Sequence, residues 1–230
     1  MNNMIVKVCG MRDGENIRQV VELGVDWIGM IFWDKSPRNV TMIPTNAGII
    51  PDRANGQWSK VNGQCKRVGV FVDEMAQNIV TRVFNYKLDI IQLHGHESPT
   101  LIRNLRLTLD PDIRPGIKII KAISVSSRDD LDATKPYEGV VDYFLFDTKC
   151  PTVGGSGQQF DWSVLAEYVG ETPFLLSGGI GPDDAERIRA FHHPKCIGID
   201  LNSRFETAPA QKDVDALRHF LSQLSGPLAS

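Results

Sequence analysis

The 230-residue sequence has few cysteines, few histidines and no long apolar run. Its 4 cysteines are scattered and form no CxxC pair, which argues against a disulfide framework. Lys and Arg number 25 against 28 Asp and Glu, so no basic excess indicates nucleic acid. No stretch approaches the roughly 18 apolar residues of a membrane span, and residues 1–4 lack signal-peptide features. These absences predict a cytoplasmic protein with reduced thiols and without nucleic-acid or membrane partners.

The sequence does contain a repeated alternation of short apolar runs with helical patterns. Most runs are apolar at nearly every position, which is typical of parallel strands buried on both faces. Between them, apolar residues recur at helical spacing, for example behind Asp13, Asp73 and Ser98. We expect eight strands, at Ile5–Cys9, Trp27–Phe32, Arg67–Val72, Asp89–His94, Ile117–Ile123, Tyr143–Asp147, Phe174–Ser177 and Cys196–Asp200.

Eight strand–helix units of this length favour one closed α/β barrel, a single (β/α)8 TIM barrel over residues 1–230. A doubly wound open sheet is the alternative, but so many strands in strict alternation make it less favoured. The second helix is the weak element, because Met42–Ile50 is short and Pro51–Gly63 reads as an exposed loop. No linker divides the chain into domains.

The carboxyl ends of the expected strands carry the candidate chemistry, since this face holds the active site of such barrels. Asp147 ends an apolar strand, where a carboxylate is costly to desolvate without a purpose. The next loop contains Gly154, Gly155 and Gly157, whose backbone can approach an anion. Together these features suggest acid–base chemistry on a phosphorylated small molecule. A helix-capping or loop-bracing role is the structural alternative for Asp147.

Other strand ends supply further candidates with structural alternatives of their own. Cys9 ends the first strand, and burial as a small apolar side chain explains it about as well as catalysis. Arg38 is either an exposed loop residue or a two-pronged ligand for a substrate carboxylate. His94-Gly-His96 resembles a metal dyad, but the other strand ends offer no matching ligands, so we expect no metal. Candidate phosphate ligands follow strands seven and eight, at Gly178, Gly179, Asn202 and Ser203.

The ordered set of short motifs resembles the phosphoribosylanthranilate isomerase family of tryptophan biosynthesis. The resemblance runs from Ile5 to about Leu224, and the ordered set is specific although each piece alone is weak. The motifs are Lys7-Val-Cys-Gly10, Ser36-Pro-Arg38, Gly69-Val-Phe-Val72, Gln92-Leu-His-Gly95, Phe146-Asp-Thr148, Gly154-Gly-Ser-Gly157, Phe160-Asp-Trp162, Ser177-Gly-Gly-Ile180 and Gly198-Ile-Asp-Leu-Asn-Ser203.

The resemblance implies an Amadori rearrangement of N-(5-phosphoribosyl)anthranilate to 1-(2-carboxyphenylamino)-1-deoxyribulose 5-phosphate, without metal or organic cofactor. It implies that Asp147 is the general acid, Cys9 the general base and Arg38 the ligand of the anthranilate carboxylate. Backbone amides around Gly179 and in the Asn202–Ser203 loop are implied to hold the phosphate. The expected enzyme is a monomer or a homodimer. Gln92, His94, Gly155 and Asp200 complete the expected pocket.

Two departures from the family and three rival functions accompany this interpretation, and the first departure is the long Pro51–Gln64 segment in place of a firm second helix. The last phosphate loop reads Asn202-Ser203-Arg204, where the family commonly has a second serine and a glycine, which puts phosphate affinity in question. A histidine-pathway aminoaldose isomerase is disfavoured because such enzymes use two strand-end aspartates rather than Cys9. Indoleglycerol phosphate synthase calls for several lysine and glutamate residues, for which Lys121 alone is thin support. A non-catalytic phosphosugar-binding barrel would need neither Cys9 nor Asp147.

Overall fold

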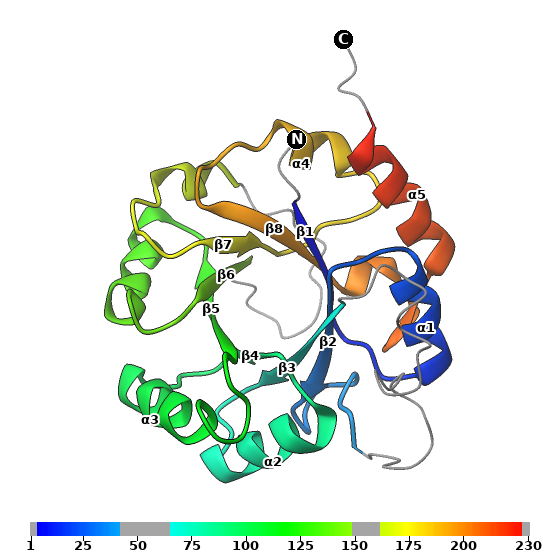
Figure 1. Ribbon diagram of the computed structural model, residues 1–230. Coiled ribbons are helices and arrows are strands. Elements are labelled where there is room, and N and C mark those ends of the chain that lie inside the picture. Colours follow the sequence, from blue (N-terminus) through cyan, green and yellow to red (C-terminus); the bar gives the residue numbers. More distant parts are fainter. Residues whose placement is uncertain (1–3, 42–64, 149–161, 227–230) are drawn as a thin grey trace.

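The computed structural model describes residues 4–41, 65–148 and 162–226. Its eight parallel strands close into a barrel in sequence order, and β1 pairs with β8 (Figure 1). The single-barrel prediction and all eight expected strands are therefore confirmed, with ends shifted by a few residues. The strands are β1 (Ile5–Val8), β2 (Trp27–Phe32), β3 (Lys66–Phe71), β4 (Ile90–Leu93), β5 (Lys118–Val125), β6 (Tyr143–Thr148), β7 (Phe174–Leu176) and β8 (Cys196–Leu201).

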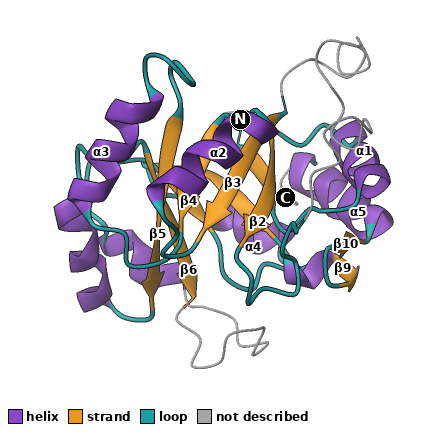
Figure 2. Ribbon diagram, turned by 90° about the horizontal axis from the view of Figure 1, so that it is seen from below, coloured by secondary structure: helices purple, strands orange, loops and turns teal. Residues whose placement is uncertain are grey.

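Helical segments surround the barrel and bury its outer face (Figures 1 and 2). Asp13 and Ser98 cap their helices by accepting from the amides of Asn16 and Leu101, as the sequence predicts. Asp73 does not cap the next helix, because Met75 holds that position and the Asp73 carboxylate accepts from the amide of His96. The helices are α1 (Gly14–Glu22), α2 (Ala76–Tyr86), α3 (Pro99–Leu109), α4 (Ala185–Ala190) and α5 (Val214–Ser225), with 3-10 segments η3 (Arg128–Tyr137), η4 (Trp162–Glu167) and η5 (Ser203–Phe205).

The barrel interior is a separate, smaller core built from strand residues alone. Side chains two residues apart on a strand share a face, so apolar positions low in the barrel lead to polar positions nearer its carboxyl mouth. On β4, for example, Ile90 lies in the interior core, and Gln92 and His94 follow at two-residue spacing. The interior cluster contains Ile5, Trp27, Val68, Ile90, Ile120, Ala122, Tyr143, Leu145, Leu175 and Ile197.

A short hairpin after β8 is an element that the sequence does not announce. Strands β9 (Glu206–Ala208) and β10 (Gln211–Lys212) pair antiparallel, and Ala210 in their turn has a φ of 68°. The side chain of Asn16 on α1 accepts from the Lys212 amide and donates to its carbonyl, at 2.8 and 2.9 Å. These two bonds fix the hairpin against α1. Across the described parts of the chain, none of the helices has the length and apolar character to cross a membrane.

Candidate active site

Cys9 lies directly after β1, buried at 3% exposure, beside a buried ion pair. Two residues earlier, the Lys7 ammonium donates to Asp200 on β8 at 2.8 Å, and neither side chain is more than 7% exposed. Residues two apart on a strand share a face, and Lys7 is close enough to Cys9 to affect the thiol's titration. Gly29 on β2 leaves room for the sulfur, because a Cβ there would stand 2.8 Å from Cys9 Sγ.

The electrostatics of this trio act on the thiol in opposing directions. Burial raises the pKa of Cys9 above its ordinary value, the Lys7 cation lowers that pKa, and the Asp200 carboxylate raises it. Burial also raises the pKa of Asp200, against the lowering effect of Lys7, while the nearby charge of Asp147 adds to the rise. Asp200 is therefore close enough to interact electrostatically with both Cys9 and Asp147.

Asp147 occupies the carboxyl end of β6 and faces His94, which follows β4. The His94 Nε2 atom lies 3.5 Å from Asp147 Oδ2, and each side chain is 32% exposed. The Gln92 amide lies 3.0 Å from His94 Nδ1 and, in this orientation, donates to it. A neutral His94 ring would then carry its proton on Nε2, directed toward Asp147. Gln92 itself is 1% exposed, so the histidine is held from below by a buried amide.

The two histidines of the His94-Gly-His96 motif have different partners. His96 is exposed and its ring approaches Asp73 at 3.1 Å, away from the Asp147 contact of His94. Among the described residues, no cluster of three or more His, Cys, Asp or Glu side chains has the arrangement to hold a metal ion. His94 and His96 therefore have separate carboxylate partners, Asp147 and Asp73.

The loops after β7 and β8 lie against each other. Gly178 and Gly179 have φ angles of 88° and 71°, a region that glycine enters without strain. A Cβ on Gly181 would stand 2.6 Å from the Nε of Arg204, which fixes how closely the two loops approach. Ser177 Oγ lies 3.5 Å from Asp200 Oδ2, so these loops also border the buried ion pair. The expected phosphate ligands Gly178, Gly179, Asn202 and Ser203 are therefore neighbours of the Cys9 trio.

Arg38 has a partner that sequence reasoning missed. Its Nε and Nη2 atoms donate to both oxygens of Glu206 on β9, at 2.6 to 3.0 Å. The Lys212 ammonium donates to Glu206 Oε1 at 2.6 Å and to Asn202 Oδ1 at 2.9 Å. The only sequence signal was an acidic and a basic residue flanking a turn after strand eight, which is too common to be specific.

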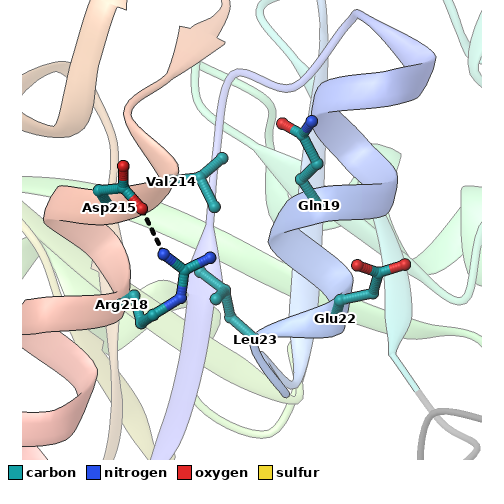
Figure 3. A pocket seen from close by; sticks show the side chains of 6 residues that line it. All are labelled: Gln19, Glu22, Leu23, Val214, Asp215 and Arg218. Atoms are coloured by element: carbon teal, nitrogen blue, oxygen red, sulfur yellow. Dashed lines mark hydrogen bonds and ion pairs between the residues drawn. The ribbon is translucent and has the colours of Figure 1, made fainter.

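Gly155, Cys150 and the uncertain second helix lie outside the described residues. Cys65 and Cys196 lie at the amino ends of their strands, where burial raises their pKa values to about 12 and about 11, so they fit structural roles. A groove of about 490 Å³ between α1 and α5 lies in the helical layer, lined by Gln19, Glu22, Leu23, Val214, Asp215 and Arg218, and shares no residue with the site (Figure 3).

Comparisons with known proteins match nearly the whole chain to one enzyme family. The profile of the family described as N-(5'-phosphoribosyl)anthranilate (PRA) isomerase matches residues 6–223. A relative of that name from Parabacteroides distasonis is 47% identical over 97% of this chain and 95% of its own. The crystal structure of phosphoribosyl anthranilate isomerase from Thermotoga maritima superposes with a TM-score of 0.77 at 30% identity, covering 97% of this chain and 100% of that chain.

A further solved structure carries a ligand. It is a phosphoribosyl anthranilate isomerase in complex with reduced 1-(o-carboxyphenylamino)-1-deoxyribulose 5-phosphate, with a TM-score of 0.74 and 28% identity. It covers 97% of this chain and 100% of that chain. The family match covers residues 6–223 and so includes Cys9, Arg38 and Asp147. It also includes the Gly178–Gly179 loop after β7 and the Asn202–Ser203 loop after β8. The chain therefore belongs to the phosphoribosylanthranilate isomerase family.

Proposed function

We propose that this protein isomerises N-(5-phosphoribosyl)anthranilate to 1-(2-carboxyphenylamino)-1-deoxyribulose 5-phosphate in tryptophan biosynthesis. The observation that carries the proposal is the convergence of Cys9 and Asp147 on one barrel mouth, where Asp200 interacts with both. The family membership of the chain and the product analogue bound to a relative support the same reaction. The change is an internal redox rearrangement, so it needs no external oxidant, metal or organic cofactor.

Asp147 acts as the general acid in this proposal. It protonates the ribose ring oxygen while the C1–O bond breaks, and the nitrogen lone pair forms the C1=N bond of a protonated Schiff base. The contact with His94 holds the carboxyl group at the mouth, where it is partly exposed and able to exchange protons with solvent. This role accounts for a carboxylate at the end of an apolar strand better than loop bracing does.

Cys9 acts as the general base that removes the C2 proton from the Schiff base. The C2–H electron pair forms the C1=C2 bond of an enolamine, and the iminium nitrogen becomes neutral. Protonation at C1 and loss of the C2 hydroxyl proton then give the ketone. An ordinary thiol is only a few per cent thiolate at neutral pH, and burial alone would reduce that fraction. The Lys7 cation opposes this effect and stabilises the thiolate.

The two ends of the substrate carry negative charge, and the site offers ligands for each. Arg38 binds the anthranilate carboxylate, and backbone amides of Gly178, Gly179 and the Asn202–Ser203 loop bind the phosphate. Arg204, which replaces the glycine common in this family, lies against Gly181 and brings a positive charge between the two loops. We infer that the Arg204 charge compensates for the conformational freedom that the last phosphate loop loses without that glycine.

Two rival functions explain fewer of these features. A synthase of the indoleglycerol phosphate type would require Lys121 in the mouth, but its ammonium donates to the Gly95 carbonyl and to Glu97 at 2.6 and 3.2 Å. A non-catalytic phosphosugar-binding barrel would have no use for a thiol beside a buried lysine. The expectation of a monomer or a homodimer stays a prediction.

The test is the fluorescence decay of freshly made phosphoribosylanthranilate with the unaltered protein, Cys9→Ala and Asp147→Asn. The unaltered protein should exceed the spontaneous rate, and each substitution should lower kcat by at least about 100-fold, the usual loss of an acid or base. Cys65→Ala is the matched control, since it removes a half-buried thiol at the opposite strand end. Unimpaired turnover by Cys9→Ala would overturn the base assignment, and no acceleration by any form would overturn the reaction.

A further inference from the structure

Glu206 forms the centre of a buried charge network at the carboxyl end of the barrel. One side of its carboxylate holds the Nε–Nη2 edge of Arg38, and Lys212 donates to its Oε1 atom from the other side. The side chains are 18% (Arg38), 5% (Glu206) and 0% (Lys212) exposed. Burial on this scale requires that the charges be paired with good geometry, as they are here.

The network reaches both proposed substrate-binding arms. Lys212 donates to the Asn202 side-chain oxygen at 2.9 Å and to its carbonyl at 3.3 Å, so it holds the loop proposed to bind phosphate. Gly10, beside Cys9, makes this convergence possible. A Cβ at Gly10 would stand 2.6 Å from Asn202 Oδ1, 2.7 Å from Arg38 Cδ and 3.4 Å from Lys212 Nζ. The two arms thus meet over one glycine, and Glu206 and Lys212 join them.

The arginine fork explains why Glu206 need not compete with a substrate. A guanidinium group has five N–H donors, which form two edges that each fit a carboxylate. Glu206 occupies the Nε–Nη2 edge, and in the described parts of the chain no side chain accepts from Nη1. The bonds to Glu206 therefore fix the guanidinium plane, and the Nη1–Nη2 edge keeps N–H donors that a second carboxylate could accept.

We propose that Glu206 and Lys212 are positioning residues that pre-orient Arg38 for the substrate carboxylate and tie that arm to the Asn202 phosphate loop. The proposal rests on the proposed function, because it takes the two substrate charges from that reaction. Neither residue touches the reacting carbons, so their effect falls on substrate binding rather than on the proton transfers. Glu206 contacts Arg38 directly and reaches the phosphate loop only through Lys212, whereas Lys212 contacts that loop directly and reaches Arg38 only through Glu206.

The alternative is that the network only stabilises the hairpin. A second cluster of the same composition provides the comparison, since Asp142 accepts from Arg106 Nη2 at 2.8 Å and from Lys118 Nζ at 2.9 Å. This cluster lies before β6, at the amino end of the barrel and away from the proposed substrate. Asp142→Asn therefore removes the same kind of charge without touching either arm.

The experiment measures KM for phosphoribosylanthranilate and the competitive inhibition constant of inorganic phosphate in Glu206→Gln, Lys212→Met and Asp142→Asn. Glu206→Gln should raise KM by about tenfold to a hundredfold, as loss of a charged hydrogen-bonding partner does, and leave phosphate inhibition within about twofold. Lys212→Met should raise both constants. Asp142→Asn should lower the melting temperature and leave both constants within about twofold.

Each other outcome contradicts the proposal in a recognisable way. An unchanged KM in Glu206→Gln, or an unchanged phosphate constant in Lys212→Met, overturns the positioning role. Equal weakening of both constants in Glu206→Gln shows general loosening and also overturns it. Lys212→Arg, which keeps charge and donors, should lie nearer the unaltered protein and serves if Lys212→Met does not fold. No turnover by the unaltered protein defeats the proposed function itself, whereas turnover without these shifts defeats the positioning role alone.

Discussion

The two ends of the barrel hold their carboxylates in different ways. At the amino end, an aspartate stands directly before each of β2, β4 and β6, and its carboxylate accepts from the second amide of the preceding strand. The backbone amide of each aspartate donates in turn to the carbonyl of the strand residue whose amide its carboxylate accepts from. The three pairs are Asp26 with Val6, Asp89 with Arg67 and Asp142 with Ile119, at 2.8, 2.9 and 2.8 Å.

At the carboxyl end, three carboxylates have polar or charged side chains as partners. Asp200 pairs with Lys7, Asp147 approaches His94, and Glu206 lies between two cations. The amino-end aspartates are bonded to strand amides even where an arginine also pairs with them, as for Asp89 and Asp142, and these backbone bonds fix strand register. The contrast agrees with the expectation that such barrels keep stabilising contacts at one end and their chemistry at the other.

The two Arg–carboxylate–Lys clusters show how burial changes the same chemistry. Both carboxylates, Asp142 and Glu206, have pKa values held below their ordinary range by their cationic partners, against the opposing effect of burial. The pKa values of the two lysines, Lys118 and Lys212, shift in opposite directions. Asp142 raises the pKa of the half-exposed Lys118, whereas burial lowers the pKa of Lys212 in spite of Glu206. Burial therefore decides the direction of the pKa shift for Lys212, the lysine at the carboxyl end of the barrel.

The largest expected effect comes from removing Lys7. Lys7→Met leaves Asp200 buried without its partner, which should cost about 3–5 kcal/mol of unfolding free energy. It should also lower kcat, because the cation that lowers the pKa of Cys9 is gone and the limb of the pH–rate profile that the Cys9 base sets moves to higher pH. Chemical unfolding and the pH dependence of kcat/KM measure the two effects.

Asp200→Asn is the matched control for that prediction, and it should act with the opposite sign on the profile. The Asp200 charge raises the pKa of Cys9, so its loss should move the limb set by Cys9 to lower pH. Limbs that move in the same direction for the two variants, or that do not move, would refute the assignment of that limb to Cys9.

A smaller effect is expected at the amino end, where Asp89→Ala removes the acceptor of the Arg67 amide. An unsatisfied amide near a buried strand should cost about 1–3 kcal/mol of unfolding free energy. Turnover should stay unchanged, because the site at the other end keeps its contacts. Urea unfolding and steady-state kinetics test both halves, with exposed Asp112→Ala as the control. A fall in kcat larger than about threefold would contradict the separation of stability from chemistry.

The sequence predicts the barrel and the strand-end residues, because buried parallel strands and their polar ends leave local signals. Asp147 is recognisable because a carboxylate ends an apolar run there, and Cys9 because it ends the first strand. The roles of Glu206 and Lys212 were not predictable, since their positions depend on how the hairpin after β8 folds back over Gly10. Contacts such as Arg38 to Glu206 join residues 168 positions apart, and periodicity carries no information about them.

The smallest expected effect is a difference in alkaline stability between the two lysines. A raised folded pKa means that Lys118 contributes stability below its unfolded pKa near 10.5, and this contribution is lost as pH rises through the folded value. A lowered folded pKa gives Lys212 the opposite slope, because the folded protein binds fewer protons than the unfolded chain and gains stability as pH approaches 10.5.

Urea unfolding of the unaltered protein, Lys118→Met and Lys212→Met between about pH 8 and 11 isolates these slopes as differences. The stability difference between the unaltered protein and Lys118→Met should shrink as pH rises, and added salt should reduce it because Lys118 is half-exposed. The difference for Lys212→Met should change in the other direction and respond less to salt. Equal pH slopes for the two variants would mean that burial of Lys212 does not outweigh its pairing with Glu206. The two clusters would then differ in position but not in how burial shifts the pKa of their lysines.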